Sequence, residues 1–378
     1  MISEESILDT FLKLCGIYSP SFKEKAIIEH ISARLAEWGI ASAVDGAGAV
    51  IGGETGNLIA KLEGSGDGPA VALLFDAHVD TVEPALGVRP VVKDDIVTSA
   101  GDTILGADDK AGVAVLMEVA RILKRERLNR GAVYFAFTVA EEQGLLGAKH
   151  LDVSSLSPDF IFTLDADGPV GSMVMRSPAH ERIFAEFFGR SAHAGVEPEK
   201  GINAIQAAAK GIARLKLGRI DDETTANVGK IEGGLASNII PGQAKVVAEA
   251  RSFDSPKLKA VVSEMKRAFE SGAEEIGAEV KMEVSRDYDS YEHGPTEPIV
   301  QLAEAAARSL GIEPTYTISG GGSNANVYLA KGKPALNLGL EVGKVHSTDE
   351  YASVSSMARL AELVIEIVKA SAGFSSRL

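Results

Sequence analysis

The chain has 378 residues, 45% of them hydrophobic and 24% charged, which allows two domains and is typical of a globular protein. The net charge of −15 argues against nucleic acid or an anionic membrane surface as a partner. The single cysteine, Cys15, excludes an intramolecular disulfide framework and a cysteine-rich zinc site. An acidic N-terminus, and no apolar run near the ~20 residues that cross a bilayer, predict a cytoplasmic protein with no membrane partner.

The first part of the chain alternates predicted helices and strands. Apolar residues at helical spacing predict helices over 3–16, 23–38 and about 110–126. Short apolar runs predict strands at 57–62, 70–76, 132–139 and 159–165. This alternation predicts an α/β layer with a mostly parallel sheet between helices.

The middle of the chain has a different order of elements. Strands are expected at 183–188, 225–232, 243–253 and 279–284, and helices at 203–217 and 255–276. The resulting order, βαββαβ, is that of a ferredoxin-like unit. Its length of about 110 residues indicates an inserted lid domain at 178–289.

After residue 290 the α/β pattern resumes. Helices are expected at 299–310 and about 354–371, and strands near 315–318 and at 335–338. We therefore predict a discontinuous α/β catalytic domain, residues 1–177 and 290–378, interrupted by the ferredoxin-like lid.

His78 and Asp80 follow the apolar run 71–75, so they emerge at the carboxyl end of a predicted buried strand. Neutral imidazole is a good zinc ligand, and ligating histidines usually donate their other N–H to a carboxylate. Because side chains at i and i+2 share one face of an extended chain, Asp80 can reach His78. A hydrogen-bonded His–Asp pair without metal is the simpler alternative.

Two pairs of acids occupy comparable positions further along the chain. Asp108 and Asp109 open a predicted helix, where they could bind metal or simply cap the helix. Glu141 and Glu142 directly follow a predicted strand. Neighbouring side chains point in different directions, so one glutamate could bind metal while the other stays free as a base. A solvated charge pair is the alternative.

Asp165 and Asp167 end the next predicted strand, and either could be a metal ligand or a turn acid. His346 lies in the polar turn 345–350 and could be structural. It could also supply the second imidazole that a balanced two-metal site needs. Carboxylates repeatedly delivered to strand ends are what a two-metal hydrolase requires.

These segments together resemble one family over nearly the whole chain. It is the dinuclear-zinc peptidase and deacylase family that includes peptidase T, carboxypeptidase G, acetylornithine deacetylase and succinyl-diaminopimelate desuccinylase. The likeness is greatest to peptidase T, and the segments that carry it are His78–Asp80, Leu105–Gly112, Glu141–Glu142 with Gly147–His150, and Phe162–Asp165. The resemblance implies a hydrolase that cleaves peptide bonds with a water activated by two Zn²⁺, with Co²⁺ or Mn²⁺ as alternatives.

The resemblance also implies residue roles. His78 and Asp165 would hold one zinc ion, and Glu142 and His346 would hold the other. Asp108 would bridge the two ions. Asp80 would orient His78, and Glu141 would be the general base. In the family the bridging acid precedes a cis peptide, here Asp108–Asp109.

The resemblance favours Asp165 over Asp167 as a ligand. Asp165 lies 23 residues after Glu142, one more than in peptidase T, and the doubled leucine Leu145–Leu146 accounts for the extra residue. Asp167 remains open.

By the same resemblance, the predicted lid would bind substrate. His193 resembles the family's lid histidine, which reaches the active site of the partner subunit, so we expect a homodimer through the lid. Asn238 and Arg251 match positions that bind the carboxylate end of the substrate, which suits the bidentate guanidinium of Arg251. The loop 320–324 would place Ser323 and Asn324 against the substrate.

One departure leaves the substrate open. Peptidase T has an arginine before its glycine pair and Thr-Asp after it, where this chain has Ser319 and Ser323-Asn324. The carboxylate that would pair with a free substrate amine is therefore absent. The resemblance implies an aminopeptidase acting on di- or tripeptides, with an N-acyl-amino-acid amidohydrolase on the same fold as the alternative. A non-catalytic metal-binding protein is a third class, but it would have no use for a free base such as Glu141.

Overall fold

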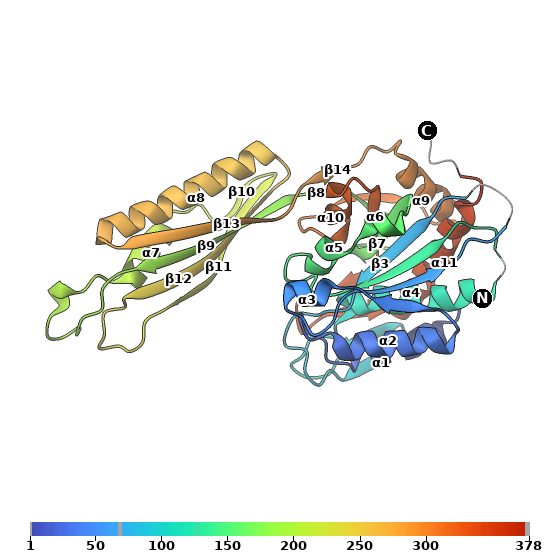
Figure 1. Cartoon of the computed structure of the whole chain (residues 1–378), viewed down its shortest axis with the longest axis horizontal. Helices are drawn as coiled ribbons and strands as arrows, with labels where there is room; N and C mark the ends of the chain where they lie inside the picture. The colour runs from blue at the N-terminus through green and yellow to red at the C-terminus, as the bar shows by residue number, and fades with distance from the viewer. Residues whose placement is uncertain (1, 67–69, 127, 375–378) are drawn as a thin grey trace. The chain divides into compact units, whose positions relative to one another are not determined.

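A computed structural model describes residues 2–66, 70–126 and 128–374 (Figure 1). Its contacts divide the chain into two compact units. The first comprises Met1–Arg176 and Glu292–Leu378, and the second comprises Ser177–Tyr291. Each unit is described by itself below.

A mixed sheet forms the centre of the first unit. Its strands, in order across the sheet, are β1 (Ser42–Val44), β2 (Leu58–Leu62), β6 (Val133–Thr138), β3 (Leu73–His78), β7 (Phe160–Ala166), β16 (Ala335–Gly339), β8 (Ser172–Ser177) and β14 (Tyr291–Glu292). A further strand, β15 (Thr315–Ile318), pairs with β8. The four central strands β6, β3, β7 and β16 are parallel, so their carboxyl ends lie at one edge of the sheet.

Helices cover both faces of this sheet. They are α1 (Glu4–Cys15), α2 (Lys25–Glu37), α3 (Ala47–Ile51), α4 (Ala107–Arg125), α5 (Leu146–His150), α6 (Val153–Leu156), α9 (Pro298–Ser309), α10 (Asn324–Ala330) and α11 (Val354–Ala370). Figure 1 shows α1, α2 and α4 on one side of the sheet and α5 and α10 on the other. Successive side chains of β3 point to opposite faces of the sheet. Phe75 packs in the main hydrophobic core, and the next residue, Asp76, accepts a hydrogen bond from Asn324 of α10.

A second, smaller sheet in this unit carries one of the predicted site segments. Its strands, in order, are β17 (Val342–Gly343), β18 (Tyr351–Ser353), β5 (Ile96–Ser99) and β4 (Pro90–Lys93). The hairpin of β17 and β18 encloses residues 344–350, and His346 lies in this loop.

The second unit is an antiparallel sheet with two helices. Its elements are β9 (Ala179–Phe188), the 3-10 helix η1 (Pro198–Lys200), α7 (Ala204–Ile212), β10 (Gly218–Asp221), β11 (Thr224–Gly233), β12 (Gln243–Ser252), α8 (Ser255–Ile276) and β13 (Glu279–Tyr288). The strand order is β10-β11-β12-β9-β13. Residues of α7 and α8 share one hydrophobic core with β9 and β12.

The predicted fold class is confirmed, and most differences concern the ends of elements. The strand predicted at 183–188 begins four residues earlier, at Ala179, and the helix predicted over 203–217 ends at Ile212. Most of the elements that the periodicity did not predict are short, because two to seven residues show too little of a repeat. These are β1, β4, β5, β8, β10, β14, β17, β18, α3, α5, α6 and α10. Within the described ranges, no helix combines the length and apolar character needed to cross a membrane.

Candidate metal centre

Three predicted site segments lie at the carboxyl ends of neighbouring parallel strands. β3 ends at His78, β7 carries Asp165 next to its last residue, and Glu141 follows the end of β6 after two intervening residues. The order β6-β3-β7 makes these strands direct neighbours. In open α/β sheets ligands bind at this edge.

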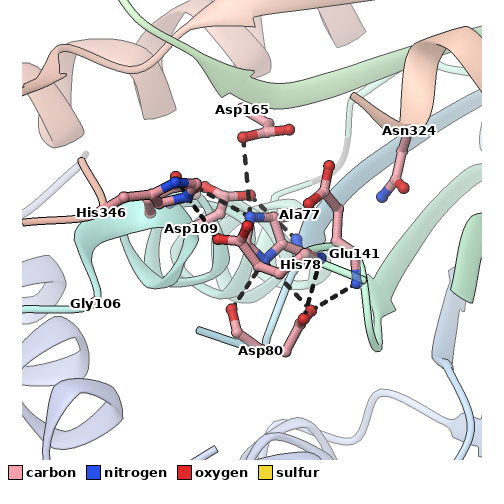
Figure 2. Close-up of polar contacts among 12 residues, drawn as sticks. Ala77, His78, Asp80, Gly106, Asp109, Glu141, Asp165, Asn324 and His346 are labelled. Atoms are coloured by element: carbon pink, nitrogen blue, oxygen red, sulfur yellow. Dashed lines mark hydrogen bonds and ion pairs between the residues drawn. The ribbon is translucent and has the colours of Figure 1, made fainter. Parts of the chain in front are cut away.

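Two further residues reach the same place from other elements. Asp108 lies at the start of α4, just after Gly106, whose φ of +76° favours glycine. The Asp108–Asp109 peptide is cis, as the resemblance implied. His346 lies in the β17–β18 loop, and Figure 2 shows His346 and Glu141 approaching His78 from opposite sides.

The buried imidazole of His78 faces carboxylates through Nε2. This nitrogen lies 3.0 Å from Asp108 Oδ1 and 3.9 Å from Asp165 Oδ1. On the other side of the ring, Nδ1 lies 2.9 Å from the backbone oxygen of Asp80 and 3.5 Å from Asp80 Oδ1. The ring is thus held from one side and presents its second nitrogen to two acids.

His346 makes a matching pair of contacts. Its Nε2 lies 2.9 Å from Glu142 Oε1 and 3.3 Å from Asp108 Oδ2. The two oxygens of Asp108 therefore face different imidazoles, Oδ1 toward His78 and Oδ2 toward His346. This is the geometry expected of a carboxylate between two cation sites.

The pKa values record how crowded these groups are. Burial, together with the charge of Asp108, holds the pKa of Asp165 well above its ordinary range. Hydrogen bonds to Asp108 and Glu142 raise the pKa of His346 to about 10. Burial would raise the pKa of Asp108, but hydrogen bonds from His346 and His78 outweigh it and leave that pKa below its usual value. The acids therefore need positive charge beside them.

The donor atoms fit divalent cations. Three sets of potential ligand atoms each lie within 4.8 Å of one another: His78, Asp108 and Asp165; His78, Glu141 and Glu142; and Asp108, Glu142 and His346. Nitrogen and carboxylate oxygen are the donors that zinc accepts in catalytic sites. Asp167 belongs to none of these sets and is exposed, whereas the carboxylate of Asp165 is only 13% exposed.

Asp80 holds the Glu141–Glu142 turn as well as the His78 ring. Its carboxylate accepts hydrogen bonds from the backbone N–H of Glu141 (2.9 Å) and of Glu142 (3.2 Å), and from the hydroxyl of Ser21 (2.7 Å). Glu141 is buried, and burial raises its pKa well above the ordinary value, although the charge of His78 acts against this. A buried carboxyl of this kind suits proton transfer.

Two acids near the centre have contacts that the sequence interpretation missed. Asp109 accepts a hydrogen bond from the backbone N–H of His78 (3.1 Å) as well as from that of Gly112 in the first turn of α4 (3.2 Å). Glu350 accepts hydrogen bonds from the backbone N–H groups of Leu105, Gly106 and Asp108. In the sequence, the only sign of these contacts is that each acid lies near a predicted ligand. Asp109 follows Asp108 at the start of a helix, and Glu350 lies in the polar turn that contains His346.

The predicted substrate residues Ser323 and Asn324 are buried at the start of α10. Asn324 Nδ2 donates to Asp76 Oδ2 (2.7 Å) and to Thr138 Oγ1 (2.9 Å), and the backbone N–H of Ser323 donates to Asn326 Oδ1 (3.0 Å). Asn324 therefore anchors the loop 320–324 to β3 and to the end of β6, whereas Ser323 bonds within the start of α10. Contact with substrate remains a prediction.

The other predicted substrate residues lie in the second unit, at opposite ends of its sheet. His193 and Asn238 are exposed in two paired loops, since the N–H of Ala194 donates to the oxygen of Asn238 (3.0 Å). These loops follow β9 and precede β12. Arg251 lies near the far end of β12, where its guanidinium contacts Glu249 at 3.2 Å. The structure thus groups His193 with Asn238 and separates both from Arg251.

Comparison with known proteins gives consistent matches. Residues 74–370 match the model of Peptidase family M20/M25/M40. The protein YqjE of Bacillus subtilis (strain 168) is 39% identical over 372 residues, covering 98% of this chain and 100% of the relative. Aminopeptidase PepT from Bacillus cereus ATCC 10987 is 40% identical with a TM-score of 0.82. A tripeptidase from Staphylococcus aureus subsp. aureus Mu50 is 38% identical with a TM-score of 0.87.

Both solved structures cover 98% of this chain, and it covers 99% of each of them. The fold and these matches define a hydrolase of the peptidase class. The chain belongs to peptidase family M20/M25/M40.

Replacing Asp165 with asparagine tests the choice between the two acids after β7. We expect Asp165→Asn to weaken Zn²⁺ binding by about 10-fold or more, because even residues that only support metal ligands contribute about 10–100-fold. Asp167→Asn is the matched control. It should leave the Zn²⁺ affinity within about twofold of the wild type, well below the loss expected for Asp165→Asn. Competition with a chromophoric chelator measures both, and equal losses would show that Asp165 is not a ligand.

Proposed function

We propose that the protein is a dinuclear zinc aminopeptidase that hydrolyses short peptides, either dipeptides or tripeptides. The observation that carries this proposal is the placement of both oxygens of Asp108 between His78 and His346. The likeness to solved structures named as an aminopeptidase and a tripeptidase, near 40% identity over almost the whole chain, supports it.

The five residues that would hold the two ions are the members of two of the three ligand sets: His78, Asp108 and Asp165, with Asp108, Glu142 and His346. Bound zinc polarises a carbonyl oxygen and lowers the pKa of water toward neutrality. Asp80 holds one member of each set, because its backbone oxygen contacts the His78 ring and its carboxylate accepts a hydrogen bond from the backbone N–H of Glu142.

Glu141 is the proton carrier in this proposal. The hydrogen bond from Glu141 to Asp80 is made by the backbone N–H of Glu141, and its carboxyl group takes no part in that contact. Glu141 takes a proton from the water that attacks the peptide carbonyl carbon, and returns it to the leaving amine when the C–N bond breaks. Its burial excludes bulk water from this transfer.

Substrate binding requires two chains. Gln243 and Arg251 are eight residues apart on β12, which at about 3.3 Å per residue separates the two ends of that strand by about 26 Å. An extended tripeptide spans only about 10 Å. His193 and Asn238 of one chain therefore cannot bind the same short peptide as Arg251 of that chain. In a homodimer, His193 and Asn238 of one subunit would act with Arg251 of the other.

Within this proposal Arg251 binds the substrate carboxylate, and His193 polarises the scissile carbonyl. Arg251 is only partly buried, as a group that must exchange its solvent for a carboxylate should be. Ser323 and Asn324 would present the loop 320–324 to the amino end of the peptide.

Metal removal and a substrate panel test the proposal directly. We expect close to two Zn²⁺ ions per chain and a loss of peptidase activity on chelation that added Zn²⁺, Co²⁺ or Mn²⁺ reverses. The panel should contain free dipeptides and tripeptides with their N-acetylated forms as matched controls. Elemental analysis measures the metal and amine release measures the reaction. Cleavage confined to N-acylated substrates would replace the aminopeptidase with an amidohydrolase, and activity unaffected by chelators would exclude the metal mechanism.

Glutamine at Glu141 and at Glu142 separates the base from the ligand. We expect Glu141→Gln to retain both metal ions while kcat falls by about 10²–10⁴-fold, because the proton carrier is lost. Glu142→Gln removes a charged ligand and should lower the metal content. Elemental analysis and steady-state kinetics distinguish the two variants. Near-normal turnover of Glu141→Gln, or the opposite pattern of metal loss, would contradict these roles.

Mixing two inactive variants tests the shared site. If each site takes His193 from one subunit and Arg251 from the other, a heterodimer of His193→Ala and Arg251→Ala has one site with both changes and one intact site. After the subunits are exchanged at random, about a quarter of all sites should be intact, since half of the dimers are then mixed. Peptidase assays before and after exchange measure the recovery. Dimers in which exchange is verified but activity does not return would exclude a shared site.

A further inference from the structure

Glu350 lies at the end of the β17–β18 loop and is 1% exposed. Its carboxylate is engaged on both oxygens by the segment that leads into α4. Oε2 accepts hydrogen bonds from the backbone N–H of Leu105 (2.9 Å) and Gly106 (2.7 Å), and Oε1 accepts one from Asp108 (2.9 Å). One side chain therefore satisfies three donors of the segment that presents Asp108.

The loop that carries Glu350 also carries His346, four residues earlier. It is closed by hydrogen bonds of its own: the N–H of Glu350 donates to the oxygen of Ser347 (3.2 Å), and the hydroxyl of Ser347 donates to the oxygen of Lys344 (2.7 Å). His346 adopts a left-handed backbone with φ of +60° in this closed loop. The positions of His346 and Glu350 are thus linked.

We propose that Glu350 is a positioning residue that fixes Asp108 relative to His346 and so sets the shape of the metal site these two share with Glu142. This inference rests on the proposed metal centre. His78 and Asp165 are held by strands β3 and β7, whereas Asp108 and His346 lie on a helix start and a loop. The carboxylate of Glu350 bonds directly to the backbone of Asp108 from within the loop of His346.

The chemistry of the contact explains why a carboxylate is needed. Ionised glutamate is an acceptor on both oxygens, so it can take N–H donors on each side. Glutamine has the same size but would turn an NH₂ group toward one set of backbone N–H groups. Charge-assisted hydrogen bonds of this kind are about twice as strong as neutral ones.

Asp95 provides a matched control in the neighbouring sheet. Its carboxylate accepts hydrogen bonds from the backbone N–H of Ser355 (2.8 Å) and from the hydroxyls of Ser353 and Ser355. Asp95 therefore anchors the chain just after Glu350, at β18 and the start of α11. Its hydrogen bonds go to residues 353–355, not to residues 105–108.

The test compares Glu350→Gln, Glu350→Asp and Asp95→Asn with the wild-type protein. Competition with a chromophoric chelator gives the Zn²⁺ affinities, the visible absorption of bound Co²⁺ reports ligand geometry, and the metal-free proteins give thermal midpoints. We expect Glu350→Gln to weaken the weaker of the two Zn²⁺ binding events by about 10–100-fold and to alter the Co²⁺ spectrum. Glu350→Asp keeps two acceptor oxygens and should recover part of the affinity. Asp95→Asn should bind Zn²⁺ with the wild-type affinity, even if its thermal midpoint falls by as much as that of Glu350→Gln.

Wild-type Zn²⁺ affinity and Co²⁺ spectrum in Glu350→Gln would overturn the inference, as would an equal loss of affinity in Asp95→Asn. If Glu350→Gln fails to fold, Glu350→Asp decides, and an unchanged affinity in that variant overturns the inference. A wild-type protein that binds no Zn²⁺ would instead refute the proposed function, so the two failures are distinct.

Discussion

The crowding of ionisable groups around Asp108 is the constraint on which the rest of the site depends. Two like charges about 4 Å apart repel by about 4 kcal/mol at an effective dielectric constant of 20. Oxygen atoms of Asp108 lie within 4.8 Å of oxygen atoms of Asp165 and of Glu142. The pKa values of Asp165 and Glu142 are both raised, first by burial and also by the charge of Asp108. Positive charge must balance these carboxylates. Protonated His78 and His346 can provide it, and so can divalent cations.

The fold holds these groups together largely through the backbone. Asp80 accepts N–H groups from the Glu141–Glu142 turn, Asp109 accepts that of His78, and Glu350 accepts those that lead into Asp108. Each of these acids accepts hydrogen bonds from peptide N–H groups through its carboxylate oxygens. The side chains of the candidate ligands beside them thereby remain directed at the candidate metal centre. A site that must exchange protons for metal ions can in this way keep its shape in both states.

Much of this could be predicted because the two-residue and 3.6-residue repeats locate strands and helices, and strand ends locate the site. Acids after three apolar runs therefore predicted the edge where His78, Asp165 and Glu141 meet. The role of Glu350 could not be predicted, because its partners lie more than 240 residues away in sequence. For Asp109 the sequence leaves metal binding and helix capping open. Its bond to the N–H of Gly112 is a contact within the start of the helix, but its bond to His78 depends on the packing of α4 against β3. The two-residue strand β17 is too short for any repeat to reveal it.

In the proposed function, the reaction and the choice of substrate depend on different parts of the chain. The candidate ligands are fixed at strand ends and loops of the first unit, beside its hydrophobic core, whereas His193 and Asn238 lie in exposed loops of the second. Loops tolerate changes that a core does not, so relatives can share the reaction and differ in substrate. In the loop 320–324 the amide of Asn324 already bonds to Asp76 and Thr138. An amide there brings no negative charge toward a substrate amine. If the protein is the proposed aminopeptidase, its selectivity for a free amino end comes from groups other than a carboxylate at this position.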